Sequence, residues 1–141
     1  MKPRYLVIII LVAIVIAAGI GIKMFFKPHA DVNKMEADFK VQATALMEEF
    51  QKEEDAATAK YSEKVLQING NLASKTQLAN GTTLLILEDE MEGISCQLDS
   101  NWVISNKSVI ESLETGSTVT VKGVFKGYLM EIKVSPAVVV K

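Results

Sequence analysis

Few residues of this chain are of types that carry chemistry. Its 141 residues include one histidine, His29, and one cysteine, Cys96. A hydrolase triad needs a base beside its nucleophile, and His29 stands in a polar stretch with no partner nearby. Cys96 alternates with Ile94 and Leu98, which favours a buried, inert thiol over a nucleophile. Since zinc also needs a Cys/His cluster, we predict a non-enzymatic protein without metal or cofactor.

An acidic run is the second group of residues that could bind an ion. Glu88, Asp89, Glu90 and Glu92 follow one another closely between two apolar segments. Carboxylates are calcium ligands, but the spacing lacks the Asp-x-Asp-x-Asp-Gly pattern of a calcium loop. The run is more typical of a solvated hairpin tip, and a weak calcium site is the alternative.

Polar and basic residues that could line a ligand face are the third group. We predict this face from six residues in the loop 74–82, the fourth strand and the last loop: Lys75, Gln77, Asn80, Lys122, Lys126 and Tyr128. Trp102 could stack on a base, but its place near a helix favours a lid over one end of the domain. Residues 28–141 hold 11 bases and 17 acids, a charge of −6, which disfavours binding to a phosphate backbone.

The element that must place this domain is the apolar run Tyr5–Ile22, eighteen residues without a charge. As a helix it would span about 27 Å, close to the roughly 30 Å hydrocarbon core of a bilayer. We predict a single-pass anchor in the cytoplasmic (inner) membrane. A cleaved signal peptide and a buried core helix are the alternatives. The basic residues Lys2 and Arg4 precede the run, so we expect the C-terminal domain outside the cytoplasm.

The remainder divides into a short stalk and one domain. Residues 1–27 form the predicted anchor, 28–61 a linker and helix, and 62–141 a barrel. Pro28–Asn33 is the linker, in which His29 is predicted to be solvated. From Met35 to Tyr61, apolar residues recur at spacings of three and four, which predicts one amphipathic helix or two in succession. This helix packs on the domain or, as the alternative, docks a partner.

After Ser62 the apolar period changes to two, which indicates strands. We predict strands over Val65–Leu72 (with a bulge at Gly70), Thr83–Leu87, Gly93–Asp99, Val119–Phe125 and Met130–Val140, the last interrupted at Pro136. A polar loop is predicted over Ser74–Thr82, and a helix over Asn106–Leu113. Five short strands with a helix between the third and fourth predict an OB-fold barrel. An SH3-like barrel and an open α+β sheet are the alternatives.

Several short motifs strengthen this prediction. Ala57-Thr-Ala-Lys-Tyr61, Gly93-Ile-Ser-Cys96, Gly116-Ser-Thr-Val-Thr-Val-Lys-Gly123 and Gly127-Tyr-Leu-Met130 resemble the tRNA_anti-like OB-fold proteins over most of residues 38–141. The resemblance implies an OB-fold behind a membrane anchor or lipoprotein signal. Val124 and Ala137 stand where many relatives have cysteines, so no role of those cysteines is expected here.

Three functions are compatible with these patterns. We expect a membrane-anchored binding module at the cell envelope whose ligand is a small molecule, a glycan or a protein. An oligonucleotide- or RNA-binding domain is the first alternative, and a structural spacer in an envelope complex is the second. A basic groove across the second and third strands would favour the oligonucleotide.

Overall fold

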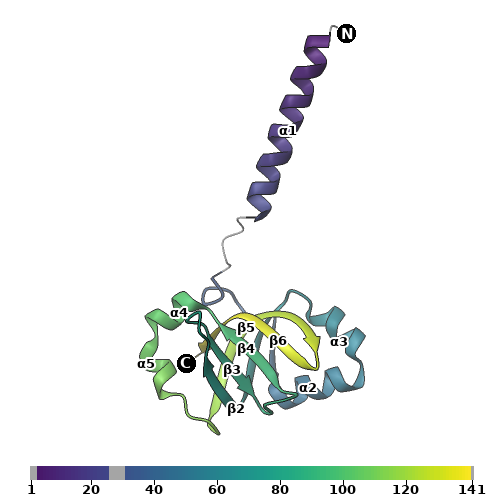
Figure 1. Ribbon diagram of the computed structural model, residues 1–141. Helices are drawn as coiled ribbons and strands as arrows, with labels where there is room; N and C mark the ends of the chain where they lie inside the picture. The colour runs from purple at the N-terminus through teal and green to yellow at the C-terminus, as the bar shows by residue number, and fades with distance from the viewer. Residues whose placement is uncertain (1–2, 26–30, 141) are drawn as a thin grey trace. The chain divides into compact units, whose positions relative to one another are not determined.

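The computed structural model describes residues 3–25 and 31–140 (Figure 1). The chain forms two compact units, residues 1–30 and 31–141. In the first, helix α1 (Pro3–Phe25) contains the whole apolar run, so the predicted helix is confirmed. Among the described residues, no helix combines the length and apolarity needed to cross a membrane. The anchor stays a prediction, and the prediction for His29 lies outside the described residues.

The second unit is built on a closed barrel of five strands (Figure 1). The strands are β2 (Val65–Gln77), β3 (Thr83–Leu87), β4 (Ile94–Leu98), β5 (Thr118–Leu129) and β6 (Glu131–Val140). Their order is β2-β3-β4-β6-β5, and β5 pairs back onto β2. Neighbours are antiparallel except β4 and β6, which run parallel. This is the strand order of the OB-fold, so the predicted five-stranded barrel is confirmed.

The barrel closes around an apolar interior. Alternate residues of β3 and β4 are buried, as a strand with one covered face requires. Gly123 lies where β5 meets β6 with a shift in register. A Cβ there would come within 2.4 Å of Val134 Cγ1 and 2.8 Å of Ala137 Cβ. A side chain on residue 123 would therefore push the two strands apart.

The bulge predicted at Gly70 is misplaced. Pairing with β5 is regular through Gly70, and the register shift in β2 falls between Leu72 and Ser74. Gly70 instead permits close packing, because a Cβ there would lie 2.6 Å from Ala43 Cβ. The glycine thus allows the first turn of a helix to pack directly on the strand.

The predicted helical segment from Met35 to Tyr61 is helical only in its later part. Phe39–Gln42 forms strand β1, which adds to β2 in parallel. Helices α2 (Ala43–Lys52) and α3 (Glu54–Tyr61) follow. The spacing of Met35, Phe39 and Ala43 fits a helix equally well, but pairing with β2 satisfies the backbone of residues 39–42. The expected pair of successive helices is correct from Ala43 onward.

Other element boundaries differ from the prediction, because some polar residues pair in a strand and some apolar residues lie in a turn. Ser74–Gln77 belongs to β2 and pairs with β3, so the predicted loop shortens to residues 78–82. Strand β6 continues through Pro136, which follows a cis peptide bond. The strand predicted from Met130 begins at Glu131, because Met130 lies in the turn between β5 and β6 and is 78% exposed.

The helical segment between β4 and β5 is longer than predicted and has two parts. Helices α4 (Ser100–Ser105) and α5 (Lys107–Ser112) replace the expected single helix over Asn106–Leu113. The Asp99 carboxylate caps α4 by accepting the Trp102 amide at 2.8 Å. Within this unit, α4 and α5 lie on one side of the barrel, and α2 and α3 lie on the opposite side (Figure 1). The two pairs of helices therefore create two different surfaces.

Candidate ligand-binding site

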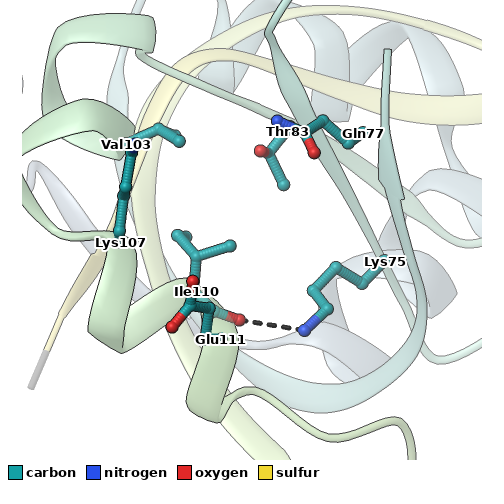
Figure 2. A pocket seen from close by; sticks show the side chains of 7 residues that line it. All are labelled: Lys75, Gln77, Thr83, Val103, Lys107, Ile110 and Glu111. Carbon is teal, nitrogen blue, oxygen red and sulfur yellow. Dashed lines mark hydrogen bonds between the residues drawn. The ribbon is translucent and has the colours of Figure 1, made fainter.

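A cavity of about 430 Å³ lies between the β2–β3 hairpin and helices α4 and α5 (Figure 2). Its lining comprises Lys75, Gln77, Thr83, Val103, Lys107, Ile110 and Glu111. The volume lies within the range of roughly 300–1,000 Å³ that is usual for small-molecule sites. Strand residues face helix residues across the open space, so one ligand could contact both.

The strand wall follows from the register of the hairpin. Lys75 pairs with Leu85 and Gln77 with Thr83. Leu85 and Thr83 are buried, so this side of the hairpin continues the interior face of the barrel beyond its closed part. Cross-strand partners point to the same side, which brings Lys75 and Gln77 to the cavity.

Lys75 also holds the helix wall in place. Its Nζ donates hydrogen bonds to the carbonyl oxygens of Ile110 at 2.9 Å and Leu113 at 2.8 Å. These carbonyls stand at the end of α5, where the helix leaves acceptors unsatisfied and a cation is favourable. An ammonium has three donors, so one remains for a ligand.

The cavity can offer several kinds of contact at once. Val103 and Ile110 supply apolar surface, and the Thr83 hydroxyl and Gln77 amide supply hydrogen-bonding groups. Lys107 and Glu111, one turn apart on α5, add one charge of each sign. No nucleophile stands beside a base in this lining. The arrangement suits binding of a small polar molecule with a carbon body.

Sequence reasoning identified two of the seven lining residues, Lys75 and Gln77. It missed Thr83, Val103, Lys107, Ile110 and Glu111, which come from β3 and the two helices. The available signal was Ile110, which shares an apolar face with Val109 and Leu113 in the helix predicted over Asn106–Leu113. Nothing in the sequence shows that this face meets the interior side of the hairpin.

The other four predicted residues lie elsewhere. Lys122 donates from Nζ to the backbone carbonyls of Asn33 at 3.1 Å and Met35 at 2.8 Å, which ties residues 33–35 to the barrel. Tyr128 stacks on Phe50 with ring centroids 5.1 Å apart. Asn80 closes the β2–β3 turn by accepting the Thr82 amide at 3.0 Å, and Lys126 is exposed. The six residues therefore do not form one face.

The outer face of β3 and β4 is the second surface on which a ligand could lie. OB-folds commonly use this face and its flanking loops. Its outward residues are Leu84, Ile86, Ser95 and Gln97. Leu84 pairs with Gln97 and Ile86 with Ser95, which places an aliphatic chain beside a polar one in each row. These four positions carry neither a base nor an aromatic ring.

Comparison with known proteins supports the assignment of the fold. The sequence model of the tRNA_anti-like family matches residues 1–137. The chain belongs to this family. The match includes residues 1–37, which lie ahead of the motifs that carried the resemblance. No curated protein sequence matches the chain.

Solved structures similar to this tRNA_anti-like chain include a candidate nucleic acid-binding lipoprotein from Klebsiella pneumoniae. It is 19% identical, with a TM-score of 0.52, and the match covers 82% of this chain and all of that one. An asparaginyl-tRNA synthetase from Pyrococcus horikoshii is 17% identical, with a TM-score of 0.44. That match covers 58% of this chain and 20% of the synthetase. At 19% identity, the likeness to the lipoprotein shows the fold alone.

Other candidate groups of this tRNA_anti-like domain are used in its packing. Cys96 is fully buried, and desolvation raises the pKa of its thiol to about 12, so the expected burial is confirmed. Trp102 packs partly buried against the core. The Asp89 carboxylate accepts the amides of Glu92 at 3.0 Å and Met91 at 2.8 Å, which lowers its pKa and closes the β3–β4 turn. Among the described residues, no group of three or more His, Cys, Asp or Glu side chains forms a metal cluster.

Proposed function

We propose that this protein is a membrane-anchored, non-enzymatic binding module of the cell envelope. Its OB-fold domain binds a small polar ligand in the cavity between the β2–β3 hairpin and α5. The ligand has a carbon body for Val103 and Ile110, and an anionic or hydroxyl group for Lys75. A sugar, an amino acid or a short carboxylic acid has this chemistry.

The observation that carries this proposal is the pair of hydrogen bonds from Lys75 to the carbonyls of Ile110 and Leu113. They fix both walls of the cavity in one geometry before a ligand arrives. Preorganisation of this kind lowers the entropic cost of binding. The Thr83 hydroxyl adds a directional contact on the strand wall.

The anchor is supported by the surface of α1. Its described side chains are mainly apolar and exposed, for example Val12 at 53%, Val15 at 68% and Ile20 at 59%. Water contact with so much apolar surface is unfavourable, and lipid would remove it. The family match begins at residue 1, so this helix is part of what the family model describes. We place the domain outside the cytoplasm because of the basic residues ahead of the run.

An oligonucleotide is the alternative ligand, since a structurally similar protein is described as a candidate nucleic acid-binding lipoprotein. Two features of this chain weigh against it. The outward positions of β3 and β4 lack bases and stacking rings, and residues 28–141 carry a charge of −6. We therefore rank the oligonucleotide below the small ligand.

The decisive experiment is methyl NMR of the full chain in nonionic detergent, with labelled isoleucine and valine. Panels of monosaccharides, amino acids and short carboxylic acids are added in turn. A ligand of the cavity should shift Ile110 and Val103 and leave Ile104, on the exposed side of α4, unchanged. In the Ile110→Trp variant the Val103 methyl groups should no longer shift because the indole fills the cavity, whereas the matched control Ile104→Trp should keep the shifts of Val103 and Ile110.

The proposal fails if no compound of the panel shifts Ile110 or Val103, or if Val103 shifts in Ile110→Trp as it does in wild type. Fluorescence anisotropy with single-stranded DNA and RNA tests the alternative, and saturable binding would favour it. A reporter fused after Lys141 and active on one side of a membrane tests the topology. A cytoplasmic signal would overturn the proposed location.

A further inference from the structure

A second surface lies at the other helix pair, beside the turn between β5 and β6. Three apolar side chains are strongly exposed there: Met91 at 83%, Leu129 at 76% and Met130 at 78%. Next to them is a hollow of about 230 Å³, lined by Met47, Gln51, Glu92, Tyr128, Met130 and Ile132. We call these side chains and the hollow the methionine groove.

Three segments that are distant in sequence build this groove. The β3–β4 loop lies beside the β5–β6 turn, because the Ile132 amide donates to the Gly93 carbonyl at 3.2 Å. Helix α2 forms the opposite wall through Met47 and Gln51. Tyr128 connects the walls, since its ring stacks on Phe50 of α2 at 5.1 Å. The floor is therefore fixed by the core, while the rim is exposed.

Folding does not explain the apolar rim. Side chains that are more than three-quarters exposed contribute little burial to the barrel. Met130 has a φ of +67°, a conformation in which glycine or asparagine is preferred. A turn of this geometry that carries Leu129 and Met130 places apolar surface in solvent at a local cost. Such a surface marks an interaction site more often than a structural one.

The charges around the groove are mainly negative. Asp89, Glu90 and Glu92 come from the β3–β4 loop, and none of them forms an ion pair with a described residue. Glu48 and Glu131 stand on α2 and β6, each within 4 Å of one lysine, Lys52 and Lys133. The rim therefore carries an excess of unpaired carboxylates next to apolar surface.

We propose that the methionine groove docks a basic, amphipathic helical segment of a partner protein. Its apolar side chains enter the hollow and cover Met91, Leu129 and Met130, and its lysines or arginines face Asp89, Glu90 and Glu92. A helix laid in a groove uses anchors at spacings of three and four, and methionines adapt well to such anchors.

Other occupants fit less well. The hollow is smaller than the roughly 300 Å³ at which small-molecule sites begin, so it suits one or two anchoring side chains. An anionic lipid surface would be repelled by the carboxylates of the rim. This proposal is independent of the cavity at α5, which lies at the other helix pair.

The test uses the full chain in nanodiscs of zwitterionic lipid and two labelled 18-residue helical peptides. Both peptides have the same leucine face, and their polar face carries either lysine or glutamate. Fluorescence anisotropy, corrected with empty nanodiscs, should show saturable binding of the lysine peptide and at least tenfold weaker binding of the glutamate peptide. Met130→Ser and Glu90→Lys should each weaken binding of the lysine peptide by fivefold or more.

Matched controls separate the groove from the rest of the surface. Ile104→Ser removes an exposed apolar side chain of α4, and Glu36→Lys reverses an exposed charge ahead of β1. Both should bind like wild type. Equal binding of the two peptides, or wild-type binding by Met130→Ser, overturns the proposal. Loss of self-association or of binding to anionic vesicles in Met130→Ser, with peptide binding unchanged, would instead assign the groove to a second copy or a membrane.

Discussion

The two helix pairs of the domain create surfaces of opposite character. The cavity at α5 is bordered by hydrogen-bonded groups, and its central lysine is held by two carbonyls. The methionine groove beside α2 has an aromatic floor but a rim of exposed apolar side chains, two of which are methionines. A fixed polar wall selects a ligand by geometry, whereas methionine side chains adapt to different shapes. One barrel can thus present a selective site and an adaptable one.

The difference depends on what lies beneath each surface. Phe50 of α2 is 2% exposed and contacts Tyr61, Phe125 and Tyr128 at ring distances of 6.0, 5.4 and 5.1 Å. It therefore joins α2 to the barrel and supports the groove. The cavity at α5 rests on Lys75 and on the end of α5, and no residue of this aromatic cluster lines it.

The largest effect should come from Phe50→Ala. Loss of a buried aromatic side chain should lower the free energy of unfolding by about 3–5 kcal/mol. Urea denaturation followed by Trp102 fluorescence measures this change. In the folded fraction, binding of the lysine peptide to the groove should be lost. The ligand-induced shift of the Ile110 methyl group should remain. If both surfaces change together, they form one cooperative site and the comparison fails. Thr44→Ala, at an exposed position of the same helix, is the control and should change neither stability nor peptide binding by much.

Lys75→Met should act on the opposite surface. It keeps the aliphatic stem but removes two exposed hydrogen bonds to the end of α5, so the free energy of unfolding should fall by about 1 kcal/mol. Hydrogen exchange of the α5 amides should increase, and ligand-induced shifts of Ile110 should disappear. Lys126→Met, at an exposed position of β5, should change stability by less than about 0.5 kcal/mol. Unchanged exchange in Lys75→Met would show that the lysine does not hold this wall.

The strands of the barrel were predictable because their apolar residues either alternate with polar ones or form a short continuous run. The prediction for Thr83–Leu87 matches β3 at both ends, since apolar residues fill that segment and a turn signal precedes it. Strand β1 was not predictable, because Phe39 and Ala43 keep a helical spacing and only the pairing with β2 distinguishes the two states. The end of β2 was missed because Ser74–Gln77 is polar on both sides.

The candidate site was predictable only as separate residues. Lys75 and Gln77 were selected as polar residues of a loop, and they reach the cavity because they are instead strand residues paired with Leu85 and Thr83. Lys122 was selected for its charge, but its ammonium is used by two backbone carbonyls 87 and 89 residues away in sequence. Partners so distant in sequence meet only when the barrel closes. A local sequence pattern carries no information on that closure.

A pH titration should affect α2 more than α5. Glu49 of α2 accepts hydrogen bonds from Lys60 Nζ and Tyr61 Oη, both at 2.7 Å. These bonds lower the pKa of Glu49 below its ordinary 4.5, chiefly through Lys60. The unfolded chain then takes up a proton first, so stability should fall as pH drops below about 4.5 and continue to fall until Glu49 is protonated in the folded state. Amide exchange across pH 3–7 should report this loosening in α2 first.

At high pH the same contact should weaken again. The bond to Glu49 raises the pKa of Lys60, and burial raises the pKa of Tyr61. Both raised pKa values stabilise the folded state below about pH 10, and this stabilisation is lost as the pH rises above it. Glu49→Gln should flatten the acid limb, and its effect at pH 7 should not exceed about 1 kcal/mol because the ion pair with Lys60 is solvent-exposed. An acid limb of wild-type steepness in Glu49→Gln would assign the pH dependence to other carboxylates.

The smallest change in stability should accompany a large change in binding. Leu129→Ser removes a side chain that is 76% exposed, so the free energy of unfolding should stay within about 0.5 kcal/mol of wild type. Binding of the lysine peptide should nevertheless weaken by fivefold or more, while ligand-induced shifts of Ile110 remain. Denaturation and anisotropy on the same preparation measure both quantities. A fall in stability of 2 kcal/mol would mean that Leu129 supports the barrel, and its exposure would then be no guide to function.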